Sequence, residues 1–325
     1  MISLNQMRHK PVLLQTVIQE LAIHEGAIFV DCNLGDGGHS EEVLKRTGGD
    51  VTIVGIDLDP EALRRAKENL SLAVEGLYGT DKLKKQPAIH YCQKNFSHIG
   101  SVVREALGKV TAGSSVDAIL FDLGLSSYEL DESGRGFSFK NDDPLEMTFG
   151  QRDHYNFTAS DIVNLWSIEQ IETIIRSYGE EKFAGRIARR IVEAREVKMQ
   201  LTGKGFETAH ELAELIRSAY PGMLRFGRIH PATKTFQALR IAVNDELTAL
   251  QESLPEAVSL LKVGGRLAVI SYHSLEDRIV KQYFKKQEEE GIVRIMTKKP
   301  IVPDENETRD NPRSRSAKLR IIEKI

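Results

Sequence analysis

Short apolar runs that end in turn residues alternate along this chain with stretches of helical periodicity, and this alternation limits the possible folds more than any other feature. The runs are AIFVDC (27–32), VTIVGIDLD (51–59), AIHYCQ (88–93), VDAILFDLG (116–124) and GGRLAVISYHS (264–274). Strands that alternate with helices form parallel sheets covered by helices. The sequence therefore predicts an α/β fold with a Rossmann-like sheet.

A long interval separates the fourth apolar run from the fifth. It spans about 140 residues, too many for a single crossover in a compact sheet. Its sequence has mainly helical periodicity, as in SIEQIETIIRSYG, EKFAGRIARRIVEARE and TAHELAELIRSAY. We therefore predict an inserted helical domain at residues 137–232, which divides the sheet domain into residues 1–136 and 233–325.

Composition limits the cellular locations and the binding partners that are expected for this protein. No apolar stretch approaches the roughly 20 residues of a membrane span, and the N-terminus lacks a signal-peptide pattern, so we expect a cytoplasmic protein with no membrane contact. The two cysteines, Cys32 and Cys92, lack the spacing of a zinc site or a disulfide framework, and no metal site is expected. A net charge of -3 means that any contact with nucleic acid must depend on local basic segments.

The strongest local signal is a glycine-rich loop between two strands. The first strand ends at Asp31, the loop NLGDGGHS follows, and the second strand ends at Asp57. Glycines allow a ligand to approach the backbone, and a carboxylate after the second strand can accept hydrogen bonds from both ribose hydroxyls. The pattern favours an adenosine-containing ligand, although Gly35, Gly37 and Gly38 by themselves are also typical of a tight turn.

Two adenosine cofactors use this architecture. The dinucleotide fingerprint needs a third glycine, but Ser40 occupies that position, and Glu41 and Glu42 would repel a pyrophosphate. S-adenosylmethionine has no phosphate and carries a positive sulfonium, which tolerates nearby carboxylates such as Asp31 and Asp36. The sequence favours S-adenosylmethionine over a nicotinamide dinucleotide.

Two further residues follow the third and fourth strands. Phe96 can lie against an adenine ring or serve as an ordinary core aromatic. Asp122 ends the fourth strand, at the edge of the sheet where ligands of open α/β folds bind. It is predicted to face the ligand, with a capping carboxylate as the alternative.

Two basic segments are candidates for RNA contact. Seven basic residues stand against two acids in the first segment: Lys182, Arg186, Arg189, Arg190, Arg195, Lys198 and Lys204. The second segment is NPRSRSAKLR (311–320), with four basic residues. A solvated helix face and an ordinary basic tail are the alternative interpretations.

A set of motifs spans nearly the whole chain. In order, they are HKPVLL (9–14), NLGDGGHS (33–40), GIDLDP (55–60), DLGLSSYELD (122–131), RGFSF (135–139), PLEM (144–147), YGEEKFAGRIARRI (178–191), HPATKTFQALRIAVN (230–244), SYHSLEDRIVK (271–281) and NPRSRSAKLR (311–320). Together they resemble the bacterial ribosomal RNA small-subunit methyltransferase H family. The resemblance implies methyl transfer to N4 of one cytidine in the decoding region of 16S ribosomal RNA, as free RNA or within the small ribosomal subunit.

The resemblance also implies a cofactor site. The matching positions are Gly37, Gly38, His39, Asp57, Phe96, Asp122 and Glu129. At position 129 the family usually has glutamine, and an ionised glutamate can accept hydrogen bonds but not donate them.

Cytosine N4 is a poor nucleophile that must be positioned and must lose a proton. Asp122 is the candidate catalytic acceptor, with a carbonyl oxygen of the LGLSS turn as the alternative. If Asp122 instead contacts the donor's amine, another group accepts the proton. Candidate substrate residues are Arg135, Phe137, His230, Arg240, Asn244 and His273. Phe137 and Phe139 can form a stacking platform or part of a core, and the histidines can be structural.

Two other functions are compatible with these patterns. One is methylation of DNA amino groups or of small molecules, although the basic inserted domain argues against a small substrate. The other is an RNA-binding assembly factor without turnover, against which the intact Asp57 and glycine loop count.

Overall fold

The computed structural model describes residues 10–108, 116–227 and 229–325. The chain forms two compact units, a sheet unit made of residues 1–124 and 247–325 and an inserted unit made of residues 125–246. The inserted unit thus begins and ends outside the predicted range of 137–232. Both additions have a physical cause: Leu125 and Leu130 pack against its core, and the helix that ends at Asn244 packs against another of its helices.

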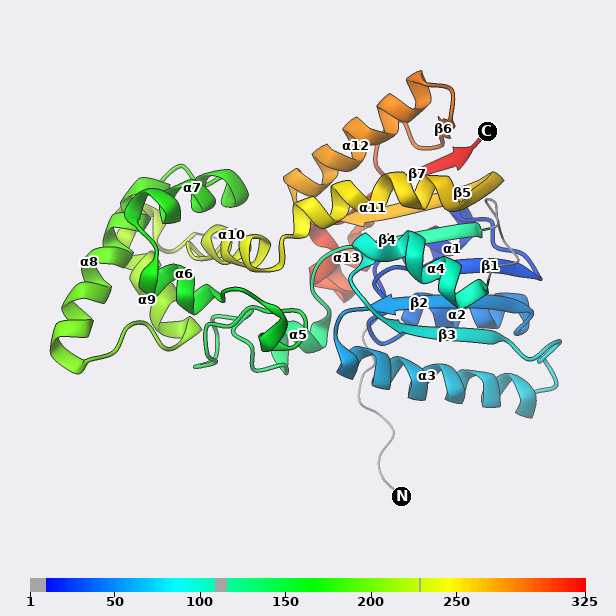
Figure 1. Ribbon diagram of the computed structural model, residues 1–325, viewed down its shortest axis with the longest axis horizontal. Coiled ribbons are helices and arrows are strands. Elements are labelled where there is room, and N and C mark those ends of the chain that lie inside the picture. The colour runs from blue at the N-terminus through cyan, green and yellow to red at the C-terminus, as the bar shows by residue number, and fades with distance from the viewer. Residues whose placement is uncertain (1–9, 109–115, 228) are drawn as a thin grey trace. The chain divides into compact units, whose positions relative to one another are not determined.

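In the described part of the chain, the sheet unit contains seven strands in the order β3-β2-β1-β4-β5-β7-β6 (Figure 1). Their bounds are β1 (Ala27–Asp31), β2 (Val51–Asp57), β3 (Ala88–Gln93), β4 (Val116–Asp122), β5 (Leu261–Ser271), β6 (Val293–Ile295) and β7 (Lys318–Lys324). The first five strands are parallel, and β7 is antiparallel to both of its neighbours. The predicted Rossmann-like α/β class is confirmed, and all five predicted strands are present.

Both faces of the sheet are buried, which explains why its strands are continuous apolar runs. Along β4, Ala118 and Leu120 enter the core on one face, whereas Ile119 and Phe121 enter the core on the other. The first core includes side chains from α1 (Leu14–Glu20), α2 (Gly38–Thr47) and α3 (Pro60–Gly79). The second includes side chains from α4 (Ile99–Leu107), α11 (Glu246–Leu260) and α12 (Ser274–Glu289). Three short elements complete the unit: η1 (Phe96–His98), α13 (Glu305–Asp310) and η4 (Pro312–Ser316).

The inserted unit is helical, as predicted, around a core of its own (Figure 1). Its elements are α5 (Ser127–Asp131), η2 (Arg152–His154), α6 (Ala159–Leu165), α7 (Ile168–Gly179), α8 (Ala184–Thr202), α9 (Ala209–Ala219), η3 (Gly222–Leu224) and α10 (Thr233–Asn244). Three of its helices begin with a capping box at Ser126, Thr158 or Ser167, in which side chain and backbone satisfy each other's first hydrogen bonds. Neither unit has, within the described ranges, a helix long and apolar enough to cross a membrane.

Candidate functional site

Three aspartates end three strands that lie side by side in the sheet. Asp57 ends β2, Asp31 ends β1 and Asp122 ends β4, and the sheet order places β1 between the other two. Parallel strands bring these carboxylates to one edge of the sheet, where open α/β folds bind their ligands. The predicted carboxylate positions therefore form one cluster.

Asp31 is the most deeply buried of the three. The hydroxyl of Ser40 donates to Asp31 Oδ2 at 2.8 Å, and Oδ1 has no hydrogen-bond partner within the described part of the chain. Burial raises the pKa of Asp31 to about 6, against the lowering effects of His39 and Ser40. A buried acceptor without a partner is costly and fits a ligand that carries donors or positive charge.

Asp57 organises the glycine loop from the next strand. The backbone N–H of Gly35 donates to Asp57 Oδ2 at 2.8 Å, and that of Asp59 donates to Oδ1 at 2.9 Å. Burial raises the pKa of Asp57 to about 6, and these two bonds oppose that shift. The carboxylate thus holds the loop and retains acceptor capacity for a ligand.

The glycines of this loop have separate structural reasons. Gly37 has a φ of +82°, a conformation that disfavours other residues. A Cβ on Gly38 would lie 2.3 Å from Pro11 Cγ, so glycine is needed here for packing against the chain rather than for ligand approach. Asp36 points to another partner, because Arg65 Nε donates to its Oδ1 at 2.7 Å.

Asp122 has a partner that the sequence did not reveal. The hydroxyl of Tyr272, just beyond β5, donates to Asp122 Oδ1 at 2.8 Å. Burial raises the pKa of Asp122 to about 7, the Tyr272 bond lowers it, and the Glu276 charge raises it. Burial and Asp122 together raise the pKa of Tyr272 above its ordinary value, so the phenol stays a donor at neutral pH.

His39 lies on the other side of Asp122. Its Nε2 is 3.2 Å from the carbonyl oxygen of Val12, which can only accept, so this nitrogen carries the proton. Its Nδ1 is 3.7 Å from Asp122 Oδ2, too far for a hydrogen bond. Burial lowers the pKa of His39, which favours the neutral ring. A neutral ring adds no positive charge beside Asp122.

Phe96 lies at the margin of a hydrophobic core of the sheet unit. Its ring packs edge-to-face on Phe121 with centroids 5.6 Å apart, and it remains partly exposed. The core interpretation thus describes part of this position, and contact of the partly exposed ring with an adenine stays a prediction.

Glu129 lies in the inserted unit and caps α5. Its Oε2 accepts from the Ser126 backbone at 2.8 Å, and its own N–H donates to Ser126 Oγ at 3.1 Å. A capping box uses glutamate or glutamine equally well. The glutamate at this position therefore preserves the local helix start.

Arg135 and Asn244 both bind backbone groups of residues 147–149. Arg135 Nη1 donates to the carbonyl oxygen of Phe149 at 2.6 Å. Asn244 Oδ1 accepts from the Phe149 N–H at 2.9 Å, and its Nδ2 donates to Met147 O at 2.7 Å. These predicted substrate residues hold a chain segment within the inserted unit.

The aromatic candidates divide between core and surface. Phe137 is buried and stacks on Phe149 at 5.6 Å, which fits the core interpretation. Phe139 is partly buried, stacks on the His230 ring at 4.5 Å, and meets Phe236 edge-to-face. His230 Nδ1 accepts from the Ala232 N–H at 3.2 Å. Of the two residues predicted to form a platform, only Phe139 retains exposed surface, as does the neighbouring substrate candidate His230.

Two remaining candidates make charged or capping contacts. Arg240 binds Glu246 through two bonds of 2.8 Å, Nε to Oε1 and Nη2 to Oε2. His273 is the N-cap of α12, and its Nδ1 accepts from the Glu276 N–H at 3.4 Å.

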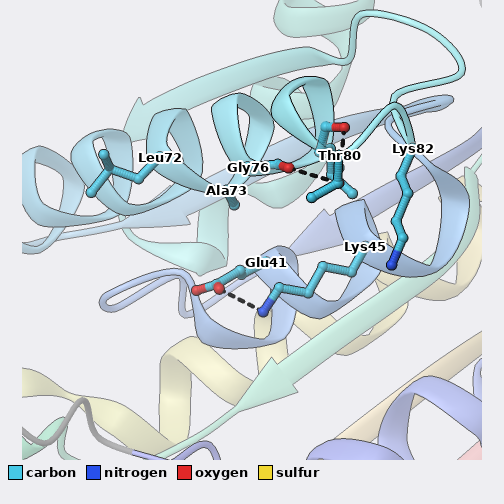
Figure 2. Close-up of a pocket in the computed structure, with 8 residues that line it drawn as sticks. Glu41, Lys45, Leu72, Ala73, Gly76, Thr80 and Lys82 are labelled. Carbon is cyan, nitrogen blue, oxygen red and sulfur yellow. Dashed lines mark hydrogen bonds and ion pairs between the residues drawn. The ribbon is translucent and has the colours of Figure 1, made fainter.

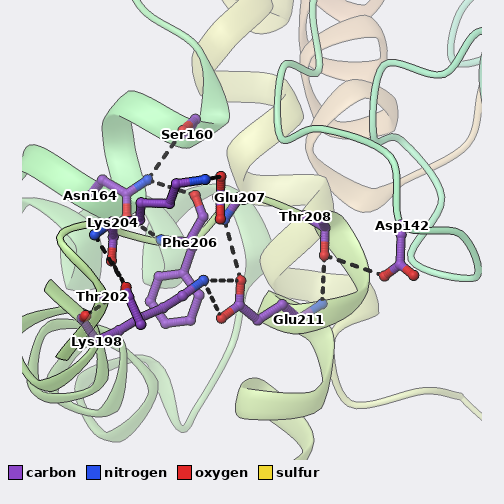
Figure 3. Close-up of polar contacts among 10 residues, drawn as sticks. All are labelled: Asp142, Ser160, Asn164, Lys198, Thr202, Lys204, Phe206, Glu207, Thr208 and Glu211. Carbon is purple, nitrogen blue, oxygen red and sulfur yellow. Dashed lines mark hydrogen bonds and ion pairs between the residues drawn. The ribbon is translucent and has the colours of Figure 1, made fainter.

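The basic residues of the segment 182–204 differ in the contacts that they make. Arg195 Nη1 donates to the Val163 carbonyl at 3.0 Å, and Arg190 pairs with Glu193 at 3.3 Å. Lys198 pairs with Glu211, and Lys204 donates to Glu207 at 2.9 Å (Figure 3).

The same network fixes the loop that follows α8. Asn164 receives the Phe206 N–H at 2.7 Å and donates to the Phe206 carbonyl at 2.9 Å. The C-terminal half of the basic segment is therefore structural.

Two of the four basic residues of the C-terminal segment have structural partners as well. Arg320 Nε lies 2.7 Å from Asp277 Oδ1, and Lys318 Nζ lies 3.1 Å from Oδ2. Both residues belong to β7, where they fasten α12 to the sheet.

A groove of about 460 Å³ lies between α2 and α3, apart from the aspartates (Figure 2). Glu41 and Lys45 form an ion pair of 2.7 Å along its α2 side. Leu72 and Gly76 line its α3 side. None of its lining residues belongs to the aspartate cluster, so it is not part of the candidate site.

Comparisons with known proteins agree with the motifs. The MraW methylase family matches residues 6–325. A ribosomal RNA small subunit methyltransferase H from Paenibacillus sp. (strain JDR-2) is 42% identical over 334 residues, covering 98% of this chain and 99% of the relative. Two proteins of the same name, from Clostridium botulinum (strain Loch Maree / Type A3) and Dehalococcoides mccartyi, are also 42% identical to this chain, and each match covers 98% of it. The matches cover 100% of the Clostridium protein and 86% of the Dehalococcoides protein. The family resemblance seen in the motifs is confirmed, and this chain belongs to the MraW methylase family.

Proposed function

We propose that this protein transfers a methyl group from S-adenosylmethionine to the exocyclic N4 of a cytidine in the decoding region of 16S ribosomal RNA. The observation that carries the proposal is the cluster of Asp31, Asp57 and Asp122 around a glycine-rich loop, in a chain that shares 42% identity with ribosomal RNA small subunit methyltransferases H. Its substrate is 16S RNA, free or within the small subunit, and its location is the cytoplasm.

The residues at the sheet edge fit this cofactor. Asp31 Oδ1 and Asn33 Oδ1 are buried acceptors without hydrogen-bond partners in the described ranges, which suits a cationic ligand with amine and hydroxyl donors. Asp57 is the residue to accept from the ribose hydroxyls, and Phe96 offers an exposed ring side to an adenine. When bound, the cofactor supplies an electrophilic methyl group on a sulfonium.

Asp122 is the candidate for handling the proton. In the reaction the N4–carbon bond forms, the carbon–sulfur bond breaks, and N4 loses one proton. A carboxylate with a pKa of about 7 is well matched to accept that proton at neutral pH. Its negative charge also stabilises the positive charge that develops on nitrogen. Tyr272 is a positioning residue, because its hydroxyl holds one carboxylate oxygen and leaves the other, Oδ2, available.

The test is methyl transfer followed by localisation. Small subunits and naked 16S RNA from cells lacking the protein are incubated with tritiated S-adenosylmethionine, and nuclease digests are read by mass spectrometry for N4-methylcytidine. DNA and metabolite pools serve as competing substrates. Methylation of DNA or metabolites in preference to ribosomal RNA, or a methyl group on another atom, would overturn the proposal.

Asp122→Asn separates catalysis from binding. Loss of the charge is expected to lower turnover at saturating donor and RNA, whereas loss of a binding contact alone raises the donor KM. Asp50→Asn, which alters a carboxylate paired with Lys85 just before β2 and outside the glycine-rich loop, is the matched control. If turnover of the Asp122→Asn variant at saturating donor and RNA is unimpaired, Asp122 has no catalytic role.

A further inference from the structure

A short segment of the inserted unit exposes several large apolar side chains. This apolar loop, residues 221–227 and 229, connects α9 to α10. Met223 is 96% exposed, Phe226 83% and Ile229 69%, and Leu224 is exposed as well. Several large exposed apolar side chains in one short segment are a candidate site of interaction.

The loop is held in shape beneath these side chains. Arg225 Nε donates to the Tyr220 carbonyl and Nη2 to the Ser218 carbonyl, both at 2.9 Å, and the Leu224 N–H donates to Pro221 O at 2.8 Å. The Arg217 guanidinium lies 5.9 Å from the centroid of the Phe226 ring. The apolar side chains are therefore displayed by a hydrogen-bonded turn, with an arginine against the aromatic ring.

A row of cations begins at the base of the loop. The Tyr220 ring packs on Phe183 at 5.0 Å, and Lys182 Nζ lies 5.1 Å over the Phe183 ring. Lys182 precedes α8 by two residues, and exposed Arg186 and Arg189, three residues apart, share one face of its first turns. None of these three cations has an acidic partner within the described ranges, unlike Arg190 and Lys198 of α8.

We infer that the apolar loop and the Lys182–Arg186–Arg189 row form a docking surface for single-stranded RNA, on which Phe226 stacks an unpaired base. This inference builds on the proposed function, in which ribosomal RNA is the substrate. Unpaired bases stack on aromatic rings and guanidinium planes while cations follow the phosphates. A duplex keeps its bases inside the stack and gives Phe226 nothing to contact. The adjoining cations favour RNA over an apolar protein groove.

The test measures binding of a fluorescein-labelled single-stranded RNA of mixed sequence by fluorescence anisotropy, with the full chain. The same strand annealed to its complement is the second probe. Phe226→Ala is expected to weaken single-strand binding about tenfold, in line with typical base–aromatic stacking. Phe226→Trp should keep the affinity and Phe226→Leu should lose it. Leu201→Ala, at a side chain that is 79% exposed near the end of α8, is the matched control and should bind as the parent does.

Three results would overturn the inference: equal affinity in the leucine and tryptophan variants, equal losses at Phe226 and Leu201, or an equal loss with the duplex. Thermal melting of each variant excludes unfolding as the cause. Binding is measured without the donor, so it is independent of methyl transfer. A parent protein that methylates no ribosomal RNA refutes the proposed function, whereas an unaltered Phe226→Ala affinity refutes only the docking surface.

Discussion

Replacing Tyr272 by phenylalanine removes one hydroxyl and leaves the ring in place. The hydroxyl donates to Asp122 Oδ1 at 2.8 Å, and a donor to a carboxylate favours the ionised form. Loss of this bond therefore raises the pKa of Asp122 above its present value of about 7. If ionised Asp122 accepts the proton from N4, the variant is less active near neutrality and recovers at higher pH.

The size of the shift follows from the bond. Hydrogen bonds to charged groups contribute roughly 1.5–3 kcal/mol, and 1.36 kcal/mol corresponds to about one pH unit. The Asp122 side chain is 22% exposed, so water replaces part of the lost bond and the lower end applies. A midpoint that moves from about 7 to about 8 lowers the ionised fraction at pH 7 from about one half to about one tenth. Turnover at pH 7 should fall about fivefold and nearly recover by about pH 9.

The assay is methyl transfer at saturating donor and RNA between pH 6 and 9. Tyr283→Phe, which removes a phenol from α12 in the same unit, is the control and should keep the parent profile. A Tyr272→Phe profile that is lowered equally at every pH would mean that the hydroxyl serves structure alone. A pH profile identical to that of the parent would mean that the rate does not depend on the ionisation of Asp122.

Three further outcomes are expected. In calorimetry, S-adenosylmethionine should bind the parent protein more tightly as pH rises from 5 to 7, because Asp57, with a pKa of about 6, must ionise to accept hydrogen bonds from the ribose. The Asp57→Asn variant should bind the donor at least about tenfold more weakly, with a flatter pH dependence. A parent affinity that does not change with pH would contradict this expectation. Charge reversal at Arg186 and Arg189 should reduce the slope of log affinity for single-stranded RNA against log salt by about 1.4, and an unchanged slope would make this helix face merely solvated. Gly38→Ala should lower the free energy of unfolding, measured in urea, by about 1–3 kcal/mol, because the added Cβ meets Pro11. Adding Pro11→Ala to this variant should restore part of the loss. If the effects of the two substitutions simply add in the double variant, the contact is not their cause.

The sequence predicted the five parallel strands because burial on both faces demands continuous apolar runs. It also placed Asp31, Asp57 and Asp122 correctly at the ends of their strands. It did not predict β7, whose basic residues suggested a tail. In the structure Leu319 and Ile321 are buried, while Arg320 and Lys318 bind Asp277. A strand whose charges are satisfied by a distant helix does not resemble a strand locally.

Hydrogen bonds between residues that are far apart in the sequence could not be predicted either. Tyr272 reaches Asp122 only because β5 lies beside β4, and Asn244 binds Phe149 across 95 positions. The motifs identified Asn244 and Arg135 as noteworthy without revealing what they bind. Periodicity reports which residues are buried, whereas such bonds depend on the pairing of elements after folding.

The pairing of β4 with β5 has a consequence for synthesis of the protein. About 140 residues must be translated after β4 before its partner appears, which takes about 7–28 seconds at common rates of 5–20 residues per second. Throughout that time β4, with buried Ala118, Ile119 and Leu120, is an unpaired edge of a nascent sheet. Open apolar edges recruit other strands. The inserted helices, in which α7 packs on both α8 and α10, are complete before β5 is translated, so they can fold while β4 is still an open edge.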